Sequence, residues 1–146
     1  MINLTCTACI SVHGVEALRF FFEGGTKNEA YAEYFEMLLE KMHEKYPNKK
    51  LVFVKDNLWA HKNTLTYRLM QDRYTKIIFT PSNTPEFSTI ENMFSHIKKK
   101  LRHVIYQKKE QVAMIVAEAM FSQTSDRIKG FFRRTLSNML RFWLTI

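Results

Sequence analysis

The sequence predicts a mixed α/β fold in which an N-terminal hairpin precedes alternating strands and helices, and further helices complete the chain. Turn residues separate two β-rich segments near the N-terminus. Two short apolar runs, at 51–54 and 76–79, alternate with segments of helical periodicity. The chain has 146 residues, of which 46% are hydrophobic and 25% charged. These values predict one globular domain with a sizeable core.

The expected hairpin pairs residues 4–12 with residues 17–22, and His13-Gly14 supplies the turn signal. Cys6 and Cys9 in its first strand form a C-x-x-C motif without a second pair. Residues three apart on a strand face opposite sides of the sheet, which is poor geometry for a metal ion. We therefore expect two free, buried cysteines in a reducing compartment.

Helices and buried strands are expected to alternate from residue 28 to residue 81. Asn28 is a candidate N-cap for a helix that ends at Pro47. The run at 51–54 is typical of a buried parallel strand, and Lys76–Phe79 is expected to be the next one, stopped by Pro81. A helix over His61–Asp72 is expected between them. Its inward residues are expected to be Leu65, Leu69 and Met70.

Helical spacing dominates the rest of the chain. One helix is expected from Thr89 to about His103, with Ile90, Met93, Phe94, Ile97 and Leu101 on its apolar side. Another is expected after Tyr106, and a break at 123–125 precedes a last helix over Arg127–Ile146. This last helix has a wide apolar face rimmed by Arg, which predicts core packing or docking on a partner.

The net charge of +8 lies entirely in the last third of the chain. Residues 1–94 carry 11 Lys/Arg and 11 Asp/Glu, whereas residues 95–146 carry 11 Lys/Arg and three acids, 11 − 3 = +8. We therefore expect a single domain over 1–146, with a neutral core at 1–94 and a basic helical part at 95–146.

The basic part predicts sequence-independent contacts with the DNA backbone. A nuclear localisation signal and a solvated helix face are the alternatives. The candidate DNA-binding residues are Lys98, Lys99, Lys100, Arg102, Lys108, Lys109, Arg133 and Arg134. No apolar stretch of about 18 residues occurs, so neither a membrane span nor a membrane partner is expected.

Two acids are candidates for phosphodiester chemistry. Asp56 follows a predicted parallel strand, and Glu91 lies in the first turn of a predicted helix. Cleavage with two Mg²⁺ ions about 4 Å apart needs several converging carboxylates. A carboxylate at the C-terminal end of a parallel strand is well placed for this role.

The residues around these acids resemble the catalytic domain of mariner-like DDE transposases, whose fold is RNase H-like. In that family a strand ends in Asp-Asn with a nearby His, here Asp56, Asn57 and His61. A later Pro-rich motif ends in Ile-Glu-Asn, followed by an aromatic residue and a Lys. This chain keeps Pro81, Pro85, Ile90, Glu91, Asn92, Phe94 and Lys98. It departs from the motif at Thr84, Ser88 and Thr89.

The resemblance implies an RNase H-like mixed sheet that lacks its first strand and, with it, the first catalytic Asp. Asp56 and Glu91 would then be vestigial catalytic residues, and no metal or other cofactor is expected. The missing strand would leave a gap in the sheet, and a protein partner would cover it.

The expected function is a catalytically inactive, DNA-associated accessory subunit or adaptor of a nuclear complex. The chain is similar in type to small accessory subunits of DNA adenine methyltransferase assemblies, which implies such a complex as a candidate. The alternative is a DDE endonuclease or transposase fragment whose first Asp is supplied elsewhere, with Mg²⁺ held by Asp56 and Glu91. A remnant of a mobile element is the third class.

Overall fold

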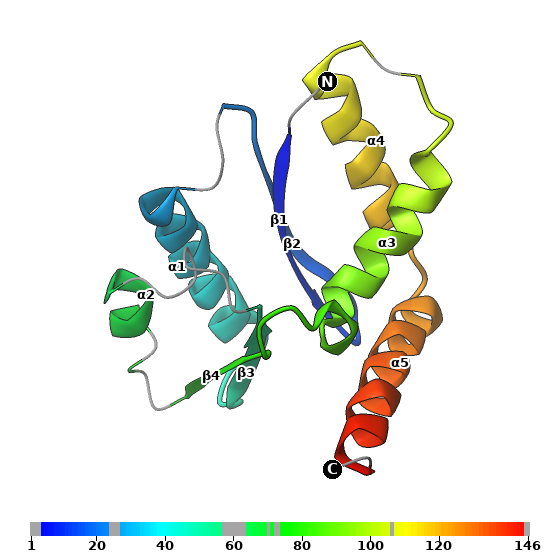
Figure 1. Cartoon of the computed structure of the whole chain (residues 1–146). Coiled ribbons are helices and arrows are strands. Elements are labelled where there is room, and N and C mark those ends of the chain that lie inside the picture. The colour runs from blue at the N-terminus through cyan, green and yellow to red at the C-terminus, as the bar shows by residue number, and fades with distance from the viewer. Residues whose placement is uncertain are drawn as a thin grey trace. The chain divides into compact units, whose positions relative to one another are not determined.

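The computed structural model describes residues 4–23, 27–56, 64–69, 71, 74–105 and 107–144 (Figure 1). The chain divides into two compact units. Unit 1 comprises Met1–Gly24 and Pro85–Ile146, and unit 2 comprises Gly25–Thr84. The change of charge predicted at residue 94 therefore falls inside unit 1, within a helix.

Unit 1 begins with an antiparallel hairpin of β1 (Thr5–Ser11) and β2 (Gly14–Phe21). The second strand starts three residues earlier than the sequence predicted, because a bulge accommodates Glu16. Cys9 pairs with Ala17 and Ile10 with Val15, which leaves Glu16 without an opposite residue. The bulge also brings Val15 and Leu18, three positions apart, to the same core.

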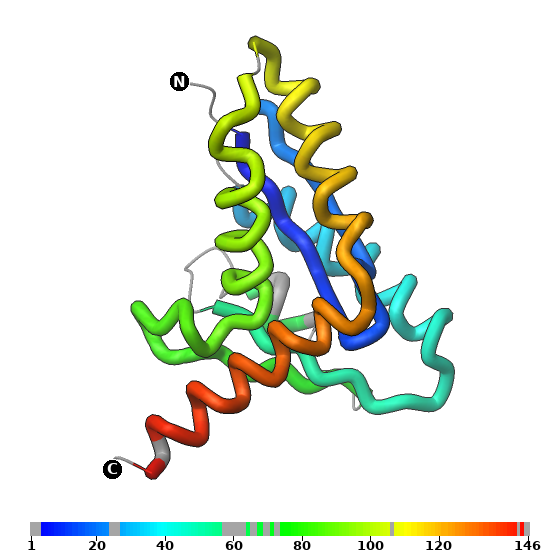
Figure 2. The backbone as a smooth tube through the Cα atoms, turned by 90° about the vertical axis from the view of Figure 1, so that its right-hand side faces the viewer, coloured from blue at the N-terminus to red at the C-terminus, as the bar shows by residue number. Residues whose placement is uncertain are grey.

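Two helices, α3 (Thr89–Leu101) and α4 (Lys109–Phe121), pack against this hairpin. Both helices lie on the same face of the hairpin in Figure 1, and Figure 2, viewed from that side, shows them next to each other in front of the blue strands. The centre of the core is formed by Met93, Ile97 and Met120. Ala8 and Ile10 of β1 pack against it, since alternate residues of a strand share one face. Of the apolar side predicted for the helix after Thr89, Met93, Phe94, Ile97 and Leu101 are confirmed as parts of this core.

The last helix, α5 (Ser125–Leu144), packs against α3 and against the short 3-10 helix η2 (Pro85–Phe87). The two segments run in opposite directions: Phe87 meets Phe142, Asn92 meets Thr135, and His96 meets Phe131. Within α5, Ile128 is completely buried, but Leu136 and Leu140 are 59% and 64% exposed. The predicted apolar face is thus only partly used for core packing.

Unit 2 places α1 (Asn28–Lys45) against a parallel pair of strands, β3 (Leu51–Lys55) and β4 (Thr75–Phe79). Phe35 of α1 is completely buried, and its ring meets that of Phe53 edge-on at 5.3 Å between centroids. The N-cap of α1 is Lys27, so the prediction of Asn28 as the cap was wrong by one residue. Asn28 already has helical geometry.

The helix expected over His61–Asp72 is described only as α2 (Thr64–Leu69). The inward side chains predicted for it, those of Leu65, Leu69 and Met70, lie outside what the structure describes. No helix in the described ranges is long and apolar enough to cross a membrane.

The described strands form two sheets of two strands each, one antiparallel and one parallel. In the parallel sheet, Phe53 lies on the side of α1, while Val52, Val54 and Ile78 on the opposite face are about half exposed. Parallel sheets are usually buried on both faces. This apolar face is therefore a surface that the described residues of unit 2 leave exposed.

Candidate functional site

Asp56 directly follows β3, as the sequence predicted for a carboxylate at the end of a parallel strand. The sheet is hydrogen-bonded up to this point, because the N–H of Thr80 donates to the carbonyl of Lys55 at 2.8 Å. The ammonium of Lys55 lies 3.3 Å from the centroid of the Phe35 ring, which fixes the strand end against α1. The Asp56 side chain is half-buried. Asn57 and His61 lie outside the described residues.

Glu91 lies in the first turn of α3 and is also half-buried. A carboxylate at this position is favoured by the positive end of the helix dipole. Ser88 is the N-cap residue of α3, and its N–H donates to the carbonyl of Pro85 at 3.0 Å. This turn joins η2 to α3 and so determines where the helix that carries Glu91 begins.

Buried Thr135 of α5 anchors the same turn. Its hydroxyl oxygen accepts hydrogen bonds from the Thr89 hydroxyl and from Nδ2 of Asn92, each at 3.1 Å. The Thr135 hydroxyl donates in turn to the carbonyl of Phe131 at 3.1 Å. Thr89, which stands where the transposase motif has Pro, therefore contributes a hydrogen bond that Pro has no donor to make. Thr135 therefore holds the turn that carries Glu91 through Thr89 before it and Asn92 after it.

Asp56 belongs to unit 2 and Glu91 to unit 1, and each is placed by its own unit. Among the residues that the structure describes, no group of three or more His, Cys, Asp and Glu side chains is arranged to hold a metal ion. The described donor set does not fit a pair of magnesium ions, which requires several converging carboxylates.

Glu16 is the first acid in the chain and is only 2% exposed. Its carboxylate accepts a hydrogen bond of 2.6 Å from the hydroxyl of Ser11, which closes the hairpin beside the bulge. This contact gives Glu16 a structural role in the hairpin.

Neither Cys6 nor Cys9 forms a disulfide, as predicted, but both are half-buried, so the prediction of buried cysteines was wrong. Burial raises the pKa of the Cys6 thiol to about 11. The Cys6 thiol is therefore protonated near neutral pH, which disfavours metal binding because thiolates are the ligands.

Two basic residues near the end of α3 lie on the same side of the helix as Glu91. Lys98 and Arg102 follow Glu91 at spacings of seven and eleven residues, close to two and three helical turns. Lys98, Lys99, Lys100 and Arg102 are all exposed. Arg133 and Arg134 are exposed on α5, and Lys108 is exposed just before α4. These side chains are accessible to a polyanion.

Lys109 differs from the other candidate DNA-binding residues. Its ammonium donates to the carbonyl of Phe22 at 2.6 Å, and its side chain is half-buried. The contact attaches the start of α4 to the end of β2, across a sequence separation of 87 residues. Gln111 completes the start of this helix, because its Oε1 accepts hydrogen bonds from the N–H groups of Gln107 and Lys108.

The packing of α5 against α3 adds a pair of residues to the basic surface. Arg127 of α5 lies beside His96 of α3, with 3.4 Å between a guanidinium nitrogen and the imidazole Nε2. The spacing of residues within one helix could not predict this pair, because the two residues are 31 positions apart in the sequence.

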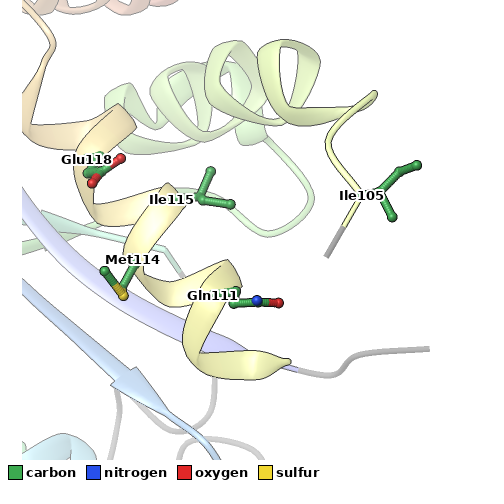
Figure 3. A pocket seen from close by; sticks show the side chains of 5 residues that line it. All are labelled: Ile105, Gln111, Met114, Ile115 and Glu118. Atoms are coloured by element: carbon green, nitrogen blue, oxygen red, sulfur yellow. The ribbon is translucent and has the colours of Figure 1, made fainter. Parts of the chain in front are cut away.

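A hollow in the surface beside α4 is lined by Ile105, Gln111, Met114, Ile115 and Glu118 (Figure 3). One carboxylate among apolar and amide side chains does not provide an acid–base pair or a metal site. This hollow is therefore separate from the candidate chemistry.

Comparison with known proteins identifies similar families and folds. A family model described as DDE superfamily endonuclease matches residues 3–113. The crystal structure of the catalytic domain of Mos1 mariner transposase matches with a TM-score of 0.80 at 13% sequence identity, covering 89% of this chain and 67% of that chain. The Mos1 mariner paired-end complex with Mn matches with a TM-score of 0.81 at 14% identity, covering 91% of this chain and 40% of that chain.

The Mos1 strand transfer complex matches with a TM-score of 0.79 at 12% identity, covering 91% of this chain and 39% of that chain. The chain thus spans about two thirds of the isolated catalytic domain and about two fifths of the longer transposase chains. These likenesses confirm the predicted RNase H-like fold class. No curated protein sequence matches the chain.

Proposed function

Because the chain belongs to the DDE superfamily endonuclease family, we propose that it is a DNA-associated accessory subunit of a nuclear protein complex and does not cleave DNA by itself. The observation that carries the proposal is the incomplete acidic set. The resemblance assigns catalytic positions to Asp56, which follows β3, and Glu91, in the first turn of α3, but the part of the chain described here contains no group of three ligands for a metal ion. Phosphodiester cleavage by two metal ions needs more than two such side chains.

Association with DNA is supported by charge and by position. Lys98, an exposed cation of α3, lies about two helical turns after Glu91 on the same side of the helix. Related chains of Mos1 transposase have been solved in a paired-end complex with the left transposon end and in a strand transfer complex. Contacts of this kind are made to phosphates, so the binding is expected to depend on salt and little on sequence.

A subunit role is supported by surfaces that the described residues leave open. In unit 2, the sheet exposes Val52, Val54 and Ile78. In unit 1, the hairpin is a sheet of only two strands. Two-stranded sheets are marginally stable alone, and an open strand edge can pair with another chain. The partner that we propose is a protein that covers these surfaces, with a DNA adenine methyltransferase assembly as the candidate complex.

Incubation of the purified protein with supercoiled plasmid, in Mg²⁺ or Mn²⁺ buffer, tests the absence of cleavage. We expect no nicking above the level of the Asp56→Ala variant, which serves as the matched control. Rapid nicking that Asp56→Ala and Glu91→Gln both abolish would contradict the proposal. Affinity purification from the native cells, followed by mass spectrometry, then tests for a stoichiometric partner.

The retained Asp56 and Glu91 favour one alternative, a DDE endonuclease whose first Asp is supplied by another segment or chain. Mos1 catalytic domain structures with raltegravir contain Mg or Mn. In the alternative, Asp56 and Glu91 would provide two of the ligands for such ions. Metal-dependent nicking that appears only when a further segment or a partner chain that supplies an Asp is added would support this alternative.

A further inference from the structure

The antiparallel packing of α3 and α5 creates a cationic cluster at His96. A guanidinium nitrogen of Arg127 lies 3.4 Å from Nε2 of His96. The His96 ring lies 5.7 Å from that of Phe131, which is one helical turn after Arg127. The imidazole is therefore positioned by two residues of α5.

The contact with Arg127 determines the protonation state of the imidazole. A guanidinium has only donors, so Nε2 of His96 must act as the acceptor and must carry no proton. Protonation at Nε2 would remove this hydrogen bond and bring two cations together. An anion placed between the two side chains would instead favour the protonated imidazole, because the guanidinium and the imidazolium would then both donate to the anion.

Further cations surround the pair. Lys99 and Lys100 follow His96 by almost one turn of α3, and Arg127 faces it from α5. Burial, followed by the charges of Lys100, Arg127 and Lys99, lowers the pKa of His96 below its usual value of 6.5. Within the described ranges, no carboxylate forms an ion pair with any of these four side chains. The cluster therefore holds a concentration of positive charge that a polyanion can neutralise.

We propose that His96, Lys99, Lys100 and Arg127 form a binding site for a backbone phosphate of DNA, and that His96 takes up a proton when the phosphate binds. On binding, Arg127 and the protonated Nε2 of His96 both donate to phosphate oxygens. Lys99 and Lys100 contribute charge and direct hydrogen bonds. The inference rests on the proposed association with DNA and adds to it a specific proton-coupled contact.

Proton uptake gives the site a defined pH dependence. In the free protein the pKa of His96 is lowered, so the imidazole is neutral near neutral pH. Bound phosphate raises that pKa. Affinity for DNA must therefore increase as the pH falls through the pKa of the bound state. The increase is about tenfold for each unit by which binding raises the pKa.

Fluorescence anisotropy with a short labelled DNA duplex, at fixed ionic strength, measures this effect between about pH 8 and about pH 6. We expect the wild-type affinity to increase toward the acidic end. His96→Gln should lose this increase, so that its affinity changes little across the range. Arg127→Gln should bind more weakly throughout the range. His103→Gln, at an exposed histidine just after α3, is the matched control and should keep the wild-type profile.

A second readout separates this inference from the proposed function. The NMR titration of the His96 imidazole should move to higher pH when the duplex is added. Inorganic phosphate at the same phosphate concentration should move it less, because isolated ions lack the other contacts of the DNA backbone. DNA binding with an unchanged His96 titration would overturn the phosphate site while leaving DNA association intact. Absence of DNA binding at every pH would overturn both.

Discussion

At the scale of single residues, Thr135 determines how the turn carrying Glu91 is held. It is buried on α5, yet its hydroxyl group joins Thr89, Asn92 and the carbonyl of Phe131. A buried donor that loses its acceptor retains the cost of its desolvation. The position of Glu91 therefore depends on a residue 44 positions away in the sequence.

Replacement of Thr135 by Val is expected to lower the free energy of unfolding by about 1–3 kcal/mol. Val has nearly the same shape as Thr but leaves the Thr89 hydroxyl and the Asn92 amide without their acceptor. Urea unfolding followed by circular dichroism measures the change. Ser137→Ala, at an exposed position of α5, is the control and should change the stability by less than about 0.5 kcal/mol. A Thr135→Val protein as stable as this control would refute the anchoring role.

At the scale of elements, α1 provides the core of unit 2 by covering one face of the β3–β4 sheet. Its buried residues follow the predicted helical spacing and include Tyr31, Leu38 and Met42. Phe35 is the central contact, because its ring meets both Phe53 and the ammonium of Lys55. The strand end that carries Asp56 is therefore held through α1.

Phe35→Ala is expected to destabilise the protein by about 3–5 kcal/mol, because it leaves a cavity and removes two ring contacts. Thermal and urea unfolding provide the measurement. Met37→Ala changes a side chain of the same helix that is 57% exposed, and it should have little effect. Equal losses in the two variants would show that α1 does not depend on its buried face.

At the scale of the whole molecule, the neutral residues 1–94 and the basic residues 95–146 do not correspond to the two compact units. Unit 1 carries 12 Lys/Arg and seven Asp/Glu, and unit 2 carries 10 and seven, so their net charges are +5 and +3. The larger excess is on unit 1, where Lys98, Arg102 and Arg133 belong to α3, its end, and α5. DNA contacts are therefore expected on unit 1.

The salt dependence of DNA binding tests this assignment. Lys98→Ala and Arg102→Ala should each reduce the slope of log affinity against log salt by about 1, since each removes one phosphate contact. Anisotropy titrations at several salt concentrations provide the slopes. Lys50→Ala, at an exposed lysine of unit 2, should leave the slope unchanged. A larger loss at Lys50 than at Lys98 would place the DNA on the other unit.

The order of the elements and much of their inward-facing pattern were predictable from the sequence, because periodicity is a local property. The spacing of Met93 and Ile97 located one face of α3, and the apolar run before Asp56 located β3. The same local patterns placed Asp56 at a strand end and Glu91 in the first turn of a helix. The uneven charge was a property of composition alone.

Only the tertiary structure decided which residues meet across the chain. It attached Lys109 to the carbonyl of Phe22, placed Glu16 at a bulge beside Ser11, and brought Arg127 to His96. It also left Leu136 and Leu140 exposed within an apolar pattern that predicted core packing or docking on a partner. These outcomes depend on how whole elements pack. The residue spacing within one element predicts which face is apolar, but it does not identify the element against which that face packs.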